Sequence, residues 1–427
     1  MKKILMIFLL SPILLRAQEV KNIGQLFDSL KSQPVSLQDE FRVQQALTGK
    51  QLAYSKLYPK VDLFGRYDHS SKAAAMLPLP LNDLFAYKAD ETRAQPFSEN
   101  IFRIGTSISM PVLVASIFPM AAKAKKLVQS AEDQKYINLL KNEAIIVGAN
   151  ANLTYLQALN KALEKKKSSL SKTLEFVHIK VNNGRAPESS LLKINDGLHQ
   201  IDILKNELAI QQEGVISVIK SLTGISLEKP INIEQVGTYQ AGVIKSLDPL
   251  RKKVDANKLN YRAEKEKLLP SLMLQANYTN SFAKSYNNNQ NINKDYTTAG
   301  LVLKVPLFAK DQYAHIKKSK LDFESSQNDL QKMSIELEAQ AEELQKSLLL
   351  IESSIQLYKQ SVEDKDQLLA IAKVSYKTDE ISMEDYLKYE DDLILEKSKL
   401  FKAKAQKWQT LMKLSVIYGN NIEEIVK

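Results

Sequence analysis

Four acidic residues in the last sixth of the chain form its densest group of side chains able to attract ions. They lie within seven residues of one another, with Lys377 as the nearby base: Asp379, Glu380, Glu384 and Asp385. Carboxylates arranged around a pore attract cations and resist anions. Acidic residues also favour the start of a helix through its dipole. The sequence leaves both interpretations open, a charged pore constriction and an ordinary helix N-terminus.

The rest of the sequence has no spacing typical of catalysis or of metal binding. It contains no glycine-rich phosphate loop and no nucleophile elbow. The four histidines are scattered, and the absence of cysteine excludes disulfides and thiolate metal sites. The neighbouring carboxylates Asp391 and Asp392 are typical of a solvated helix surface. We therefore expect no enzyme activity, no catalytic residue, no cofactor and no bound metal.

The N-terminal residues have the pattern of a secretory signal peptide. Lys2 and Lys3 precede the apolar stretch Ile4–Leu15, and Ala17 offers a cleavage point. This stretch is too short for a bilayer-spanning helix, although an N-terminal anchor is the alternative interpretation. Removing residues 1–17 lowers the formal charge from +10 to +7, and the remaining lysines are mixed with acids. We expect an exported chain that does not bind nucleic acid.

Four segments have the alternation of a β-strand with one apolar face. The apolar-face residues are Val61, Leu63, Gly65 and Tyr67; Phe102, Ile104, Thr106, Ile108 and Met110; Leu272, Leu274, Ala276 and Tyr278; and Ala299, Leu301, Leu303 and Val305. Each segment has about the 9–11 residues that a tilted strand needs to cross a membrane. Soluble β-hairpins are the alternative, but long helices isolate each pair of segments.

The alternation predicts which side chains would face lipid. Ile104, Ile108, Leu301 and Leu303 are expected on the lipid side, and Arg103, Ser107 and Lys304 on the lumen side. No apolar run after the signal is long enough for a transmembrane helix. Any membrane-spanning part must then be a β-barrel, because backbone polar groups need partners in lipid.

Very long helical segments follow each pair of strands. Their apolar residues keep the three-and-four spacing of a coiled coil, and more than 60 helical residues would extend about 90 Å. We predict these boundaries: a signal peptide at 1–17; a first repeat at 18–222, with a helix, a β-hairpin at 59–111 and a helical hairpin at 118–222; a linker at 223–247; a second repeat at 248–418, with a helix, a β-hairpin at 270–306 and a helical hairpin at 309–418; and a tail at 419–427.

Each helical hairpin is predicted to turn at a short tip. Gly184 suits a C-terminal cap at the first tip, and Pro187 suits the first turn of the returning helix. At the second tip Ser382 followed by Asp385 resembles a capping box. Glu380 is expected to stand where the first copy has Gly184.

The two halves of the chain repeat one plan. Pro111 and Pro306 lie 195 residues apart, and so do Gly224 and Gly419. In this order the motifs resemble the outer membrane efflux protein family, the TolC-like channels, over nearly the whole mature length. The motifs are the helix-to-strand prolines Pro59 and Pro270, the strand-to-helix prolines Pro111 and Pro306 with Leu307 and Phe308, the two tips, and the ends at Thr223-Gly224 and Tyr418-Gly419.

The resemblance implies a mainly α-helical fold with membrane β-strands. Its duplicated unit of long α-helical hairpins and two transmembrane β-hairpins would form a homotrimer, with an α-barrel tunnel and a shared twelve-stranded β-barrel. The chain would lie in the outer membrane with a long periplasmic extension. It would conduct substrates passively from a periplasmic adaptor and an inner-membrane pump.

Within that family plan the tips become site candidates. Asp379, Glu380, Glu384 and Asp385 are expected at the pore or gate, where threefold repetition would make a ring. Gly184 and Arg185 are expected to contact the adaptor. The alternative function is a periplasmic coiled-coil adaptor or structural protein, although adaptors carry soluble β-domains rather than two membrane-length hairpins.

Overall fold

The computed structural model describes residues 20–89, 92–378 and 380–427, so the predicted signal peptide lies outside the described residues. The described chain divides into two compact units. Residues 20–41, 134–247 and 334–427 form the helical unit, and residues 42–133 and 248–333 form the strand unit.

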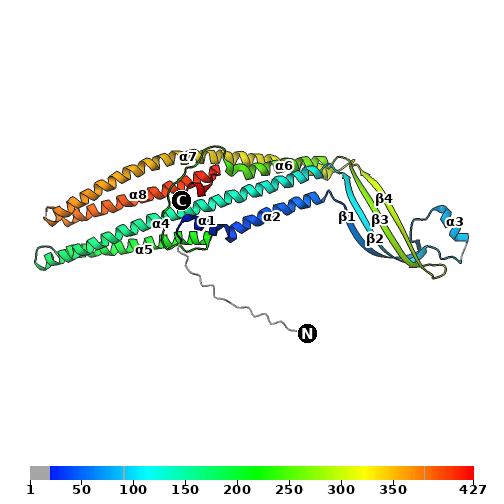
Figure 1. Cartoon of the computed structure of the whole chain (residues 1–427), viewed down its shortest axis with the longest axis horizontal. Helices are drawn as coiled ribbons and strands as arrows, with labels where there is room; N and C mark the ends of the chain where they lie inside the picture. The colour runs from blue at the N-terminus through cyan, green and yellow to red at the C-terminus, as the bar shows by residue number, and fades with distance from the viewer. Residues whose placement is uncertain (1–19, 90–91, 379) are drawn as a thin grey trace, which may run out of the picture. The chain divides into compact units, whose positions relative to one another are not determined.

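The strand unit contains one antiparallel sheet with the order β1-β2-β3-β4 (Figure 1). Its strands are β1 (Lys60–Ala75), β2 (Phe97–Leu113), β3 (Ser271–Lys284) and β4 (Asn291–Lys304). The helix α6 (Asp248–Glu266) precedes β3. Pairing of Gly105 with Phe64 and with Thr279 sets the registers of β2.

Two features of the first hairpin differ from the sequence prediction. β2 continues past Pro111, which pairs with Met273, and the register shifts between Pro111 and Leu113. A bulge of this kind accommodates a proline that cannot donate to the ladder. The hairpin predicted at 59–111 also contains a short helix between its strands, α3 (Leu81–Ala89).

The chain forms two antiparallel helical hairpins, α4 (Ile117–Asn182) with α5 (Ser189–Thr223), and α7 (Lys310–Lys377) with α8 (Met383–Tyr418) (Figure 1). The helical unit contains α5, α8 and the parts of α4 and α7 from residues 134 and 334 onward. The seam of the first hairpin has a residue every seven positions from each helix: Leu156, Leu163, Leu170 and Val177 pack against Ile194, Ile201 and Leu208. A seven-residue repeat keeps one apolar stripe facing its partner along a supercoil. The coiled-coil prediction for this hairpin is confirmed.

Two smaller helices begin the chain. Asn22 accepts a hydrogen bond from the amide of Gln25 and caps α1 (Ile23–Lys31). Pro34 is the first residue of α2 (Pro34–Ser55), where its missing N–H has no helical role.

Each repeat ends at a left-handed glycine. Gly224 has φ +72° and Gly419 has φ +67°, values that residues with a Cβ seldom adopt. Ser29 donates to the carbonyl of Thr223 at 2.6 Å in the first copy, and Ser246 donates to that of Ile417 at 3.0 Å in the second. In each copy a serine thus bonds a carbonyl at the end of the last helix of the repeat.

The linker and the tail are joined to each other. Gln235 and Val426 form an antiparallel bridge. Beside it, the amide of Glu234 donates to the carbonyl of Lys427, and the amide of Lys427 donates to the carbonyl of Glu234. Short 3-10 helices, η1 (Lys245–Leu247) and η2 (Ile422–Glu424), flank this contact, and Ile422 is fully buried. The linker and tail thus form one packed structure within the helical unit.

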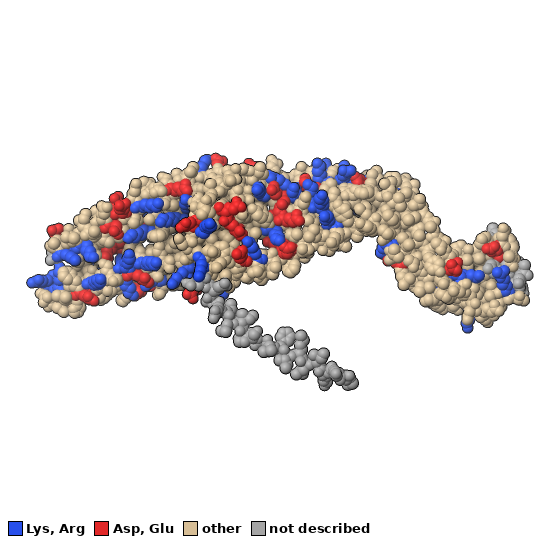
Figure 2. Space-filling view, in the orientation of Figure 1, with Lys and Arg blue, Asp and Glu red and all other residues tan. Residues whose placement is uncertain are grey.

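The surface charge differs between the helices and the strands. Figure 2 shows Lys and Arg interspersed with Asp and Glu over the helices, and a largely uncharged surface over the strands. Large apolar side chains are exposed there, among them Leu63, Leu301 and Leu303. No α-helix in the described ranges is apolar over a length that would cross a membrane.

Candidate functional site

The second tip has the predicted helix cap. Ser382 accepts a hydrogen bond from the amide of Asp385 at 3.1 Å, and its hydroxyl donates to the Asp385 carboxylate at 2.5 Å. Ser382 is the N-cap of α8 and has extended backbone geometry. Asp385 is therefore held by the cap, which accounts for an acid in the first turn without any pore role.

The predicted equivalence of Glu380 and Gly184 is wrong. The amide of Glu380 donates to the carbonyl of Ser375 at 2.9 Å, as the amide of Arg185 donates to that of Lys180 at 2.8 Å. Both bonds are the six-to-one link of a Schellman motif, so Glu380 corresponds to Arg185. Gly184 then corresponds to Asp379, which lies outside the described residues.

The acids of the second tip have different surroundings. Glu384 forms an ion pair with Lys193 of α5, with both side chains mostly exposed. Such an exposed pair contributes little to stability but offsets the acid's charge. Glu380 is exposed, and its carboxylate pairs with no base in the part of the chain that the structure describes.

At the first tip, Gly184 has φ +68° and its amide donates to the carbonyl of Val181 at 2.9 Å. The predicted glycine cap is confirmed. Pro187 lies just before α5 rather than in its first turn, and its carbonyl accepts from the amide of Ser190. Gly184 and Arg185 are both exposed.

An aromatic cluster that the sequence analysis missed lies inside the tips. Tyr376 stacks on Tyr386 with ring centroids 5.2 Å apart, and Phe176 meets Tyr376 edge-on at 6.2 Å. Burial raises the pKa of Tyr386 to about 12, and its hydroxyl donates to Glu390 at 2.7 Å. Tyr376 and Tyr386 flank the second tip in sequence, a signal that could have indicated the cluster.

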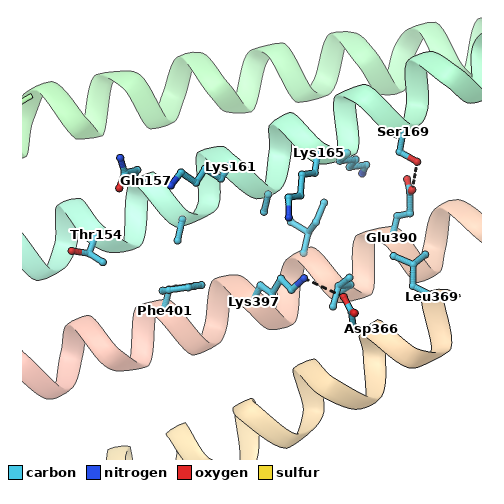
Figure 3. Close-up of a pocket in the computed structure, with 15 residues that line it drawn as sticks. Thr154, Gln157, Lys161, Lys165, Ser169, Asp366, Leu369, Glu390, Lys397 and Phe401 are labelled. Carbon is cyan, nitrogen blue, oxygen red and sulfur yellow. Dashed lines mark hydrogen bonds and ion pairs between the residues drawn. The ribbon is translucent and has the colours of Figure 1, made fainter. Parts of the chain in front are cut away.

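A groove of about 620 Å³ lies among α4, α7 and α8 (Figure 3). Lys161 and Lys165 line it from α4, and Lys397 reaches Asp366 at 3.3 Å. Glu390 is buried at its end and accepts a hydrogen bond from Ser169. Within the described residues no group of histidine and acidic side chains is arranged to hold a metal ion.

The sheet has one polar and one apolar face. The pairing of Arg103 with Arg66 and Ser281, and of Ser281 with Lys294, places these residues on one face of all four strands. The same registers place Ser107 and Lys304 on this polar face, and Ile104, Ile108, Leu301 and Leu303 on the other. The predicted division of these residues between two faces is confirmed.

A buried carboxylate in α4, that of Glu143, is a second feature that was not predicted from the sequence. Glu143 is only 2% exposed and has a carboxylate oxygen without a hydrogen-bond partner. Burial, and then the negative charge of Glu423, raise the pKa of Glu143 to about 7, while the ammonium of Lys31 lowers it. Lys31 itself is paired with Glu423 at 2.8 Å, which weakens its effect on Glu143.

Duplicated helical hairpins, each following a pair of strands in one two-faced sheet, define the fold of outer membrane efflux channels. The model of the outer membrane efflux protein family matches residues 245–420, which confirms the resemblance predicted from the sequence. No curated protein matches this chain.

Solved outer membrane channels share the fold of this chain. The CmeC channel of Campylobacter jejuni has 17% identity and a TM-score of 0.77, over 93% of this chain and 85% of that one. The VceC protein of Vibrio cholerae has 14% identity and a TM-score of 0.77, over 93% and 96%. The MtrE channel of Neisseria gonorrhoeae, solved in an open state, has 12% identity and a TM-score of 0.72, over 93% and 89%. The predicted fold class is confirmed.

Proposed function

We propose that this protein is the outer-membrane channel of a tripartite efflux or export system. The two-faced sheet carries the proposal most directly, because a mainly apolar face suits lipid and a polar face suits a water-filled lumen. The channel conducts passively, and an inner-membrane pump joined through a periplasmic adaptor supplies the energy. The four-stranded sheet lies in the outer membrane, and the long helices line a tunnel in the periplasm.

The sheet edges support an assembly of several chains. β1 and β4 are the two edges of the described sheet, and each pairs on one side only. Unpaired backbone edges are not tolerated in lipid, so the edges must meet those of other copies. A homotrimer with a shared twelve-stranded barrel, as in the efflux family, closes the sheet.

We expect the chain to fractionate with the outer membrane and to run as a trimer in mild detergent. Sedimentation of membrane fractions and native mass measurement check this result. A stable folded monomer would contradict the shared barrel. Recovery in the soluble periplasmic fraction would favour the adaptor or structural-protein alternative.

At the second tip, Asp379 and Glu380 are the proposed lining of the pore constriction. Glu380 supports this role by its exposure and its lack of a described basic partner, whereas Glu384 is paired with Lys193 and Asp385 belongs to the helix cap. Three copies of an unpaired carboxylate around one axis would select cations.

Asp379→Asn combined with Glu380→Gln should weaken cation preference and blunt block by divalent cations, because both charges leave the ring. Reversal potentials from single channels in a salt gradient measure the effect. The matched control is Glu363→Gln with Asp364→Asn, an exposed acidic pair on α7 away from the tip. Unchanged selectivity in an intact double-variant trimer would remove Asp379 and Glu380 from the pore.

The first tip is the proposed contact for the adaptor. Gly184 and Arg185 are exposed at a tight turn, and the guanidinium of Arg185 can form paired hydrogen bonds with a partner carboxylate. A photo-crosslinker in place of Arg185 should capture the adaptor in cells. A second crosslinker site at the exposed Lys172 of α4 serves for comparison. Capture of the adaptor from position 172, but not from position 185, would place the contact elsewhere.

A further inference from the structure

The start of the connection between β1 and β2 lies against the polar face of the sheet. Ala75–Pro78, the last residue of β1 and the three that follow it, border a groove of about 360 Å³ that is lined by Phe64, Arg66, Arg103, Thr279 and Tyr296. Thr279 and Ser281 are buried as a result, although they belong to the polar face. We call Ala75–Pro78 the inner segment.

An apolar contact anchors the inner segment. Met76 is fully buried against Ile101 and Ile292, with Ala283 beside them. The strand registers place Ile101, Ala283 and Ile292 on the polar face, as a local apolar patch. Such a patch would be unfavourable in a water-filled lumen unless Met76 covered it.

Polar contacts hold the same segment. Arg103 forms an ion pair with Asp68 and donates to the carbonyl of Ala75 at 3.1 Å. Ser281 donates to the carbonyl of Met76 at 3.0 Å, and the amide of Met76 donates to Pro96. Gln95, just before β2, exchanges hydrogen bonds with the buried hydroxyl of Ser285. The inner segment is therefore held by an exposed bond from Arg103 to Ala75 and by a buried bond from Ser281 to Met76.

We propose that the inner segment narrows the outer exit of the channel and sets the size of solute that passes, with Arg103 as the residue that positions it. The inference rests on the proposed channel function, in which the polar face lines the lumen. Three copies would bring three inner segments into one opening, a constriction separate from the one proposed at the helix tips.

Arg66 provides a matched control for Arg103. The two residues are register partners on the same face, and both contact Asp68. Of these two arginines, only Arg103 donates to the backbone of the inner segment among the described contacts. Replacing either arginine by Gln removes one positive charge. Only the Arg103 variant also removes the bond to the Ala75 carbonyl, so only that variant should release the inner segment.

The test measures access to Ser107 from outside intact cells. Since the chain has no cysteine, Ser107→Cys gives a single thiol on the polar face. A small cationic methanethiosulfonate reagent should label it quickly, and a bulky polyethylene glycol maleimide slowly. Arg103→Gln and Met76→Ser should each raise the rate of the bulky reagent by about tenfold and leave the small reagent nearly unchanged, because relief of a steric constriction admits larger solutes.

The outcomes separate the constriction from the channel. With Arg66→Gln, the bulky reagent should still label the cysteine slowly. With Arg103→Lys, the labelling should be nearly as slow as with the original Arg103. Equal bulky-reagent rates in all variants, or equal acceleration by Arg66→Gln and Arg103→Gln, would overturn the constriction. Failure of the small reagent to label Ser107 in an intact trimer would instead count against the water-filled lumen and thus against the proposed function.

Discussion

Replacing Glu143 with Gln should stabilise the protein at pH 8 by about 3 kcal/mol and should have little effect near pH 4. The pKa of Glu143 is raised from 4.5 to about 7 in the folded chain. The folded state therefore binds this proton more tightly than the unfolded state does. The favourable contribution of Glu143 is complete below pH 4.5 and is lost as the pH rises through 7.

Glutamine stays neutral at every pH, which burial favours. The stability of the Glu143→Gln variant relative to the parent should therefore increase as the pH rises from 4.5 through 7. Urea unfolding of the protein in detergent at both pH values measures this advantage. Glu175→Gln, at an exposed position on the same helix, should show no such pH dependence. A Glu143→Gln variant that is less stable than the parent at pH 8 would mean that the carboxylate has a stabilising partner.

Arginine at Ile104 should destabilise the folded protein by about 2–4 kcal/mol if the position lies near mid-membrane, because in the proposed barrel the guanidinium would face lipid. Ser107→Arg, on the polar face, should cost much less. Folding titrations into lipid vesicles compare the two variants. Cysteines at the same positions give an independent check with a water-soluble thiol reagent. Faster labelling at Ile104 than at Ser107 would reverse the assignment of the two faces.

Local periodicity was sufficient to predict the main elements. The period-two pattern from Val61 to Tyr67 and from Phe102 to Met110 predicted two strands, and the glycines at 184, 224 and 419 predicted helix ends that the positive φ values confirm. These signals are local, because side-chain alternation and left-handed geometry depend on neighbouring residues.

The contacts that determine the sites are not local. Glu384 and Lys193 lie 191 residues apart in the sequence, and Ser281 and Met76 lie 205 apart. Periodicity cannot indicate which exposed acid meets which base, or that a loop covers a polar face. Glu143 did carry a readable signal, since it lies three residues from both Leu140 and Ile146, which are buried. A carboxylate within an apolar stripe indicates a titrating group inside a core.

The bridge between Gln235 and Val426 has a consequence for the order of events during folding. It closes a loop of 191 residues, and loop closure of that size has an entropic cost of several kcal/mol, roughly (3/2)RT ln n. The first repeat can pack its own hairpin before the second has folded. The bridge must wait until the second repeat has brought the C-terminal tail back to the linker. It therefore forms late and joins the two repeats only after each has folded.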